Sequence, residues 1–149
     1  MKAQRRGWLK GAGALLLAGL LKPIAALAAW NKAAFSSKTS AEAMKSLGTP
    51  AAEASSGIVI DAPQIAENGA VVPIEVTSNI PGTTSIAVLV EKNPYPLVAK
   101  FDFMEGALPF VKINAKMGET SDVRVVATAG GKHYQATKEI KVTIGGCGG

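Results

Sequence analysis

The chain ends in Gly145-Gly146-Cys147-Gly148-Gly149, and Cys147 is its only cysteine. Buried cysteines normally pack among apolar side chains, whereas the residues beside this one have no side chain. Glycine runs keep wide backbone freedom and are costly to order. The pattern predicts a solvent-accessible nucleophile on a flexible C-terminal arm.

The length of this arm favours a carrier over an enzyme. Three residues separate the α-carbons of Ile144 and Cys147, so the thiol extends at most ~10 Å from the domain. An enzyme holds its nucleophile rigidly against a base. Activation of a thiol also needs a nearby cation, metal or helix N-terminus, and the tail contains none. We therefore expect partner enzymes to activate Cys147, and we predict no catalytic residue in this chain.

Other kinds of chemistry have weaker support in the sequence. His133 is the only histidine, so a Cys–His dyad is conceivable, although a solvated residue beside the Gly130-Gly131 turn is the simpler interpretation. One cysteine with one histidine does not make a metal site. The terminal glycines do not follow a strand and open a helix, which excludes a phosphate-binding loop. We predict no metal and no cofactor.

The N-terminus reads as an export leader. Arg5 and Arg6 precede Trp8, an apolar run over 11–21 and a small-residue site ending at Ala28. The arginine pair resembles a twin-arginine export signal. The apolar run is shorter than the ~20 residues of a membrane span. We expect residues 1–28 to be cleaved, which leaves no membrane anchor and places the mature protein in the periplasm.

Removal of the leader changes the charge of the chain. The whole chain has a net charge of +5 and a pI of about 9.4. Five basic residues and no acidic one lie in the leader, so the mature part holds 11 basic and 11 acidic residues. No basic stripe with aromatics remains, which argues against nucleic-acid binding. In an oxidising compartment a lone cysteine has no internal disulfide partner.

The mature chain divides into an N-terminal part (29–57), a β-rich domain (58–144) and the arm (145–149). Residues 31–47 favour a short helix, with a break near Ser36-Ser37 and an end at Gly48. Residues 49–57 form a Pro/Ala/Ser linker without periodicity. Asn68-Gly69 and 93–96 are turn signals between strands.

Alternating apolar and polar residues predict about seven strands. The predicted strands are 58–60, 70–77, 85–91, 97–104, 110–117, 122–128 and 134–144. Short strands without helices between them are typical of an antiparallel β-sandwich. Because Ile140, Val142 and Ile144 alternate with polar residues, we expect pairing of the last strand up to Gly145.

Joined together, these features resemble the SoxY family of sulfur carriers. The segments that carry the resemblance are Gly145-Gly146-Cys147-Gly148-Gly149, Ala62-Pro63-Gln64-Ile65-Ala66-Glu67-Asn68-Gly69 with Val71-Val72-Pro73, and Glu91-Lys92-Asn93-Pro94 before Pro96-Leu97. The twin-arginine leader adds to it. The resemblance implies an immunoglobulin-like sandwich and a role in thiosulfate oxidation, with substrate attached covalently to Cys147.

The resemblance also implies partners. Family members form a heterodimer with SoxZ, which is co-exported without a leader. A haem c-containing enzyme conjugates thiosulfate to the cysteine, a hydrolase releases sulfate, and a sulfane dehydrogenase acts in organisms that have it. Two alternatives remain besides the Cys–His enzyme: a module that dimerises through Cys147, and a carrier that bears sulfur on the carboxylate of Gly149.

Overall fold

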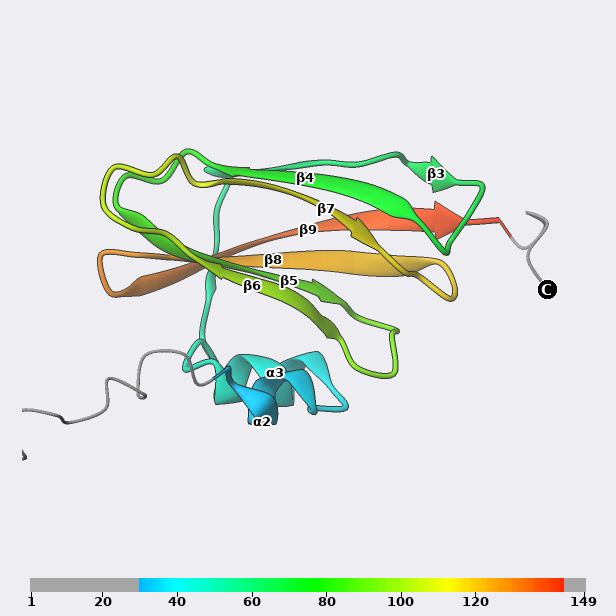
Figure 1. Ribbon diagram of the computed structural model, residues 1–149, viewed down its shortest axis with the longest axis horizontal. Coiled ribbons are helices and arrows are strands. Elements are labelled where there is room, and N and C mark those ends of the chain that lie inside the picture. The colour runs from blue at the N-terminus through cyan, green and yellow to red at the C-terminus, as the bar shows by residue number, and fades with distance from the viewer. Residues whose placement is uncertain (1–29, 144–149) are drawn as a thin grey trace, which may run out of the picture. The chain divides into compact units, whose positions relative to one another are not determined.

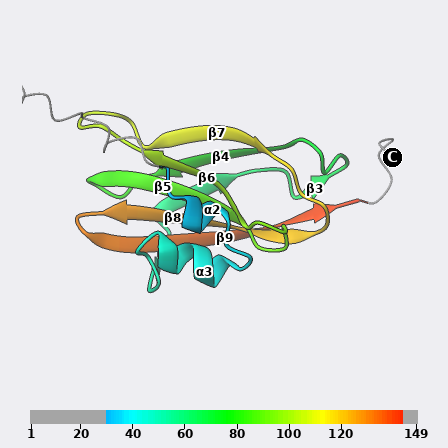
Figure 2. The same ribbon diagram turned by 60° about the horizontal axis from the view of Figure 1, so that its bottom comes forward.

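The computed structural model describes residues 30–143, and these form three layers: a pair of helices, a larger sheet and a smaller sheet (Figure 1, Figure 2). The helices are α2 (Lys32–Phe35) and α3 (Ser40–Ser46). The larger sheet contains β1 (Glu53–Ala54), β3 (Ile65–Ala66), β5 (Thr83–Val90), β6 (Leu97–Asp102), β8 (Ser121–Ala129) and β9 (Lys132–Val142). The smaller sheet contains β2 (Ile58–Asp61), β4 (Val72–Ser78) and β7 (Phe110–Ala115). The predicted mainly β, immunoglobulin-like sandwich is confirmed.

All seven predicted strands are present, with ends shifted by up to two residues. The larger sheet has the order β1-β9-β8-β5-β6, and β5, β6, β8 and β9 pair antiparallel. Gly130 and Gly131 both have positive φ angles of 57° and 75° in the two-residue turn between β8 and β9. A turn of this kind matches the twist of the flanking strands, so it sets the register of the strand that leads to the arm.

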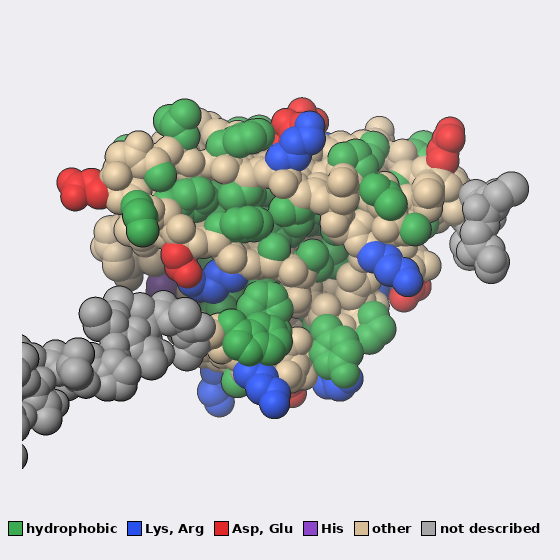
Figure 3. Space-filling view, in the orientation of Figure 1, with side chains coloured by type: hydrophobic (Ala, Val, Ile, Leu, Met, Phe, Trp, Pro, Cys, Tyr) green, Lys and Arg blue, Asp and Glu red, His purple; other side chains and the backbone are tan. Residues whose placement is uncertain are grey.

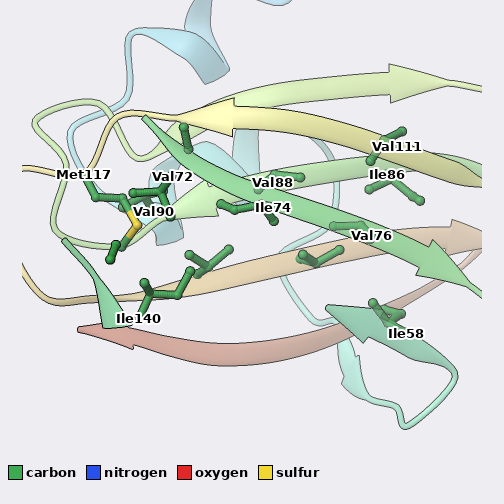
Figure 4. Close-up of a cluster of buried hydrophobic side chains, with 14 of the residues drawn as sticks. Ile58, Val72, Ile74, Val76, Ile86, Val88, Val90, Val111, Met117 and Ile140 are labelled. Atoms are coloured by element: carbon green, nitrogen blue, oxygen red, sulfur yellow. The ribbon is translucent and has the colours of Figure 1, made fainter. Parts of the chain in front are cut away.

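The main core lies between the two sheets (Figure 4). On β4, Val72, Ile74 and Val76 are fully buried, as their alternation with polar residues predicts. They pack with inward-facing side chains of β5, β7, β8 and β9, including Ile140 near the end of β9. Burial of a side chain of this size contributes about 1.5–3 kcal/mol, so the core holds the last strand firmly.

A second core covers the opposite face of the larger sheet. Val88 and Val90 of β5 point into the main core, as predicted, but Ala87 and Leu89 between them are also buried. They pack with Met44 and other residues of the helices. The helical segment is therefore a layer of the fold, and the continuous apolar run of β5 reflects burial on both faces.

The helices begin and end at ordinary capping signals. Thr39 caps α3, because its side-chain oxygen accepts the N–H of Glu42 at 3.2 Å. The Glu42 carboxylate accepts the N–H of Lys38 at 3.1 Å. Gly48, with φ of 76°, follows the helix. The predicted break near Ser36-Ser37 and the end at Gly48 are confirmed. No helix among residues 30–143 is long and apolar enough to cross a bilayer.

Two short strands were not predicted. The segment 49–57, expected to be a plain linker, contains β1, which pairs in parallel with Tyr134 and Gln135 of β9. Farther along, β3 pairs in parallel with Lys141 and Val142 of the same strand. Each is only two residues long, too short to show a periodic pattern. Together they cover the outer edge of β9 at its two ends.

Hydrophobic side chains also reach the surface between the two sheets. Figure 3 shows them as a band on the side of the molecule that carries the edge strands β6 and β7. Phe101, Phe103 and Ile113 are partly buried there and pack against the main core. Apolar side chains of both edge strands are therefore only partly covered within this chain.

Candidate functional site

The predicted site residues of the arm lie outside the described residues, as do Arg5 and Arg6 of the predicted leader. These arm residues are Gly145, Gly146, Cys147, Gly148 and Gly149. What the structure describes is the root of the arm, which we define as the end of β9 up to Thr143. We call the end of the sandwich where Thr143 lies the arm end; it is formed by the loops 67–71, 91–96 and 116–120 (Figure 1, right).

The arm root changes its hydrogen-bonding partner as the strand ends. The ladder between β8 and β9 stops at the pair of Ser121 with Ile140. Beyond it, the N–H of Lys141 donates to the carbonyl oxygen of Gln64 at 3.0 Å, and the N–H of Thr143 donates to that of Ala66 at 3.1 Å. The predicted pairing of the last strand therefore continues through Thr143, and positions 144 and 145 lie outside the described residues.

A side chain completes the ladder on the other edge of this strand. The N–H of Val142 points toward β8, but β8 begins only at Ser121. The hydroxyl oxygen of Thr120 accepts this N–H at 3.0 Å. The backbone donors from Lys141 to Thr143 are thus all bonded, as partly buried backbone groups require.

Gly69 packs directly against the arm root. A Cβ atom on Gly69 would lie 2.2 Å from the carbonyl oxygen of Met117 and 2.8 Å from a side-chain carbon of Val142. The N–H of Met117 donates to the carbonyl oxygen of Gly69 at 2.7 Å. Only glycine allows this approach, so the predicted Asn68-Gly69 turn has a second role in holding the end of β9.

The neighbouring loops are also linked to one another. The side-chain amide of Asn93 donates to the carbonyl oxygen of Lys116 at 2.8 Å, and the N–H of Lys92 donates to the hydroxyl of Ser121 at 3.1 Å. A pocket of about 320 Å³ lies here, lined by Asn93, Pro94, Lys116 and Gly118. The predicted 93–96 turn is therefore a fixed part of the arm end.

The 91–96 loop also makes polar contacts with the larger sheet and with the loop between the two helices. Glu91 pairs with Arg124 at 2.6 Å, and Arg124 donates to the side-chain oxygen of Gln135 at 2.7 Å. The ammonium of Lys38 lies 3.7 Å from the ring centroid of Tyr95. Hydrogen bonding and the positive charge of Lys38 lower the pKa of Tyr95 below its ordinary value. The arm end is thus braced from the helical side as well.

His133 lies at the opposite end of the sandwich. It is half-buried on β9 rather than solvated in the turn, and its Nδ1 is 3.1 Å from the hydroxyl of Thr128. Ten residues of strand separate it from Thr143, about 30 Å at the usual rise. Four residues from Thr143 to Cys147 extend at most ~14 Å. The two side chains therefore cannot meet within one chain, which excludes the Cys–His dyad.

Other parts of the described chain offer little for catalysis. A pocket of about 500 Å³ lies at the far end, lined mainly by 78–84 and 103–109, with Glu105 as its one ionisable side chain. Another, of about 580 Å³, lies between α3 and the larger sheet around the bonded Arg124. Across residues 30–143, no three His, Cys, Asp or Glu side chains lie close enough to hold a metal ion.

Comparisons with known proteins agree with this arrangement. The family model for the sulfur oxidation protein SoxY matches residues 43–147. The solved structure of the sulfur carrier protein SoxY from Chlorobium limicola f thiosulfatophilum is 41% identical, with a TM-score of 0.61. The chain belongs to the SoxY family. This similarity covers 67% of the chain and 93% of the Chlorobium SoxY, and the family supports a role as a carrier in sulfur oxidation.

A more distant similarity concerns the fold. A superoxide reductase (neelaredoxin) from Ignicoccus hospitalis has a TM-score of 0.52 and 19% identity, over 58% of this chain and 80% of its own. A comparison with curated proteins gave no match. The SoxY family thus shares its sandwich architecture with proteins of other activity.

The structure also shows what one SoxY-like segment does. Residues 62–69 were quoted above only as a resemblance, but they supply Gln64, Ala66 and Gly69 to the arm root. The turn signal at Asn68-Gly69 was visible in the sequence. The contacts of Gln64 and Ala66 are made by backbone atoms, so residue type gives no sign of them.

Proposed function

We propose that this protein is a periplasmic carrier that holds thiosulfate-derived sulfur covalently on Cys147 and presents it to partner enzymes. The observation that carries the proposal is the match to the SoxY family model, which runs to position 147 and so ends on the cysteine. The hydrogen-bonded arm root supports it, because it fixes the point from which the arm leaves the domain. Cys147 cannot reach His133, and this supports a carrier that catalyses no reaction of its own.

The chemistry belongs to the partners in this proposal. A haem c-containing enzyme joins the thiol to thiosulfate, forming an S–S bond; the thiol proton is released and two electrons pass through the haem, one at a time, to a one-electron acceptor. A hydrolase adds water across the terminal sulfur–sulfur bond, releasing sulfate and leaving a persulfide on Cys147. A sulfane dehydrogenase, where present, oxidises the remaining sulfur. A persulfide reacts with other thiols, and the chain has no second cysteine to capture the sulfur.

Export and assembly complete the proposal. The Arg5-Arg6 leader directs the folded chain through the twin-arginine pathway and is removed after Ala28. A leaderless SoxZ subunit travels with it as a heterodimer. A substitution of both arginines by lysine is expected to retain the precursor inside the cell, which fractionation and the mass of the chain would reveal.

Intact-mass spectrometry of the protein from cells grown on thiosulfate tests the carrier function. The expected result is a set of adducts spaced by sulfur atoms or sulfite, absent from Cys147→Ser. In a reconstituted system, Cys147→Ser abolishes thiosulfate oxidation whereas His133→Ala leaves it within twofold of wild type. Thiosulfate oxidation by Cys147→Ser at the wild-type rate would refute the proposal, as would a doubled mass that reductant abolishes, found as the sole modification.

A further inference from the structure

The short reach of the arm limits where an enzyme can bind. Cys147 lies four residues beyond Thr143, so its α-carbon stays within ~14 Å of the anchored α-carbon of Thr143. If an enzyme encloses the thiol in a channel, part of the arm lies inside the enzyme. Only the rest of the arm then bridges the distance between the two proteins. A small, transient protein interface covers less than ~600 Å² on each partner, a patch no more than roughly 14 Å in radius. Any such enzyme must therefore rest on the arm end.

Two large apolar side chains are exposed where this contact must form. Ile65 of β3 is 55% exposed and Val71, in the loop before β4, is 54% exposed. Their neighbours Ala66 and Val72 are buried. Single exposed hydrophobic residues are common, but these two lie in a segment that hydrogen-bonds and packs against the arm root. Ile65 is paired with Lys141 of β9, and Val71 is two residues from Gly69, which packs on Val142. The surface they offer is apolar and close to the exit of the arm.

The charged residues around them do not produce a field of one sign. Glu67 and Glu119 lie at the arm end with Lys92, Lys116 and Lys141, and all five side chains are exposed. The mixed charges therefore favour neither an acidic nor a basic partner. The exposed apolar side chains are the feature that an enzyme can recognise. The backbone beneath it is fixed by hydrogen bonds to β9, so little ordering is needed on binding.

We infer that Ile65 and Val71 form an apolar docking patch for the mouth of the channel through which each enzyme receives Cys147. The inference rests on the proposed carrier function. The expected occupant is a channel mouth with apolar side chains at its rim and no strong charge. The contact is small, and small interfaces are typical of transient complexes, which suits a carrier that several enzymes must release in turn.

The test uses the double variant Ile65→Glu with Val71→Glu in the mature chain, co-expressed with its partner subunit. The control is Val59→Glu, because Val59 is 47% exposed on β2, which pairs with the far end of β4. The measurements are kcat/KM for thiosulfate conjugation by the haem c-containing enzyme and the rate of alkylation of Cys147 by iodoacetamide. We expect kcat/KM to fall at least tenfold in the double variant only, with all alkylation rates within twofold.

Several results would overturn the docking patch. One is a kcat/KM for conjugation of the double variant equal to that of the wild type. Another is an equal loss of kcat/KM in Val59→Glu. The third is a fall in the alkylation rate of the double variant as large as its fall in kcat/KM. If the double variant does not fold, Ile65→Thr with Val71→Thr replaces it and should lower kcat/KM at least threefold; an unchanged value refutes the patch. Failure of the carrier function itself looks different, because wild-type protein would then acquire no adduct in the same assay.

Discussion

The N–H of Thr143 donates to the carbonyl oxygen of Ala66 at 3.1 Å, across 77 positions of sequence. Among residues 30–143, this bond is the backbone contact made nearest to the arm, just beyond the end of β9, and it is made to β3 rather than to the main ladder. The segment that supplies it also supplies Gly69, which packs on Val142. The SoxY-like signature at 62–69 thus holds the end of the strand that precedes the cysteine motif at 145–149 in the sequence.

Gly69→Ala should destabilise the protein. The added Cβ would lie 2.2 Å from the carbonyl oxygen of Met117, so the backbone must move. We expect a loss of about 2–4 kcal/mol in the free energy of unfolding, measured by urea denaturation. Gly118→Ala is the matched control, because nothing lies within 4 Å of its Cβ position, and it should change stability by less than about 0.5 kcal/mol. Equal effects would contradict the close approach at Gly69.

Thr120→Val should loosen the arm root without unfolding the domain. The substitution removes the oxygen that accepts the N–H of Val142. Since a hydrogen bond contributes about 0.5–1.5 kcal/mol net, hydrogen exchange at Val142 should become roughly three- to tenfold faster. Thr137 is an exposed threonine on β9, the strand that contains Val142. The control variant Thr137→Val should therefore leave the exchange rate of the Val142 amide unchanged. Unaltered exchange in Thr120→Val would show that the bond contributes nothing to the anchoring.

Shortening the arm should separate enzymatic loading from chemical reactivity. Deletion of Gly145 and Gly146 places Cys147 two residues beyond Thr143, within ~7 Å. Enzymatic conjugation of thiosulfate should fall at least tenfold, while alkylation by iodoacetamide stays within twofold. Deletion of Gly148 and Gly149 is the companion variant: it keeps the reach, so alkylation should persist, whereas a carrier that uses the terminal carboxylate would lose all loading. Normal conjugation after the first deletion would refute the reach argument.

Lys38→Met should raise the pKa of Tyr95. Lys38 favours the ionised phenolate, so the pKa of Tyr95 in the folded protein is below the ordinary value of 10.0. The associated stabilisation is therefore present above the pKa of the unfolded chain and is lost as pH falls through the folded pKa. Titration of the Tyr95 ring by NMR in the wild-type protein and in the variant measures this shift. An identical Tyr95 titration in both proteins would contradict the contact.

Much of the sandwich was predictable because its strands are amphipathic. Val72, Ile74 and Val76 alternate with polar residues, and burial on one face follows. The helical layer was harder to foresee, although a signal was present. The unbroken apolar run around Ala87 and Leu89 is typical of a strand covered on both faces, and here the second cover is the pair of helices.

The arm root was not predictable in the same way. Both short strands that pair with β9 depend on tertiary contacts of backbone atoms, which any residue type can make. The role of Thr120 depends on β8 starting two residues too late to pair with Val142, and strand ends are the least certain part of a sequence-based prediction. Likewise, the alternation in β9 predicted a paired last strand but not which segment holds its end.

The fixed position of Thr143 also determines how often a docked enzyme meets the thiol. A group confined within ~14 Å of an anchor has an effective concentration on the order of millimolar or higher at the channel mouth. Under the proposed carrier function, each enzyme would therefore encounter Cys147 as an intramolecular reactant once the domain has bound. The affinity of the domain contact can stay low without slowing the chemical step, so successive enzymes can exchange quickly on one carrier.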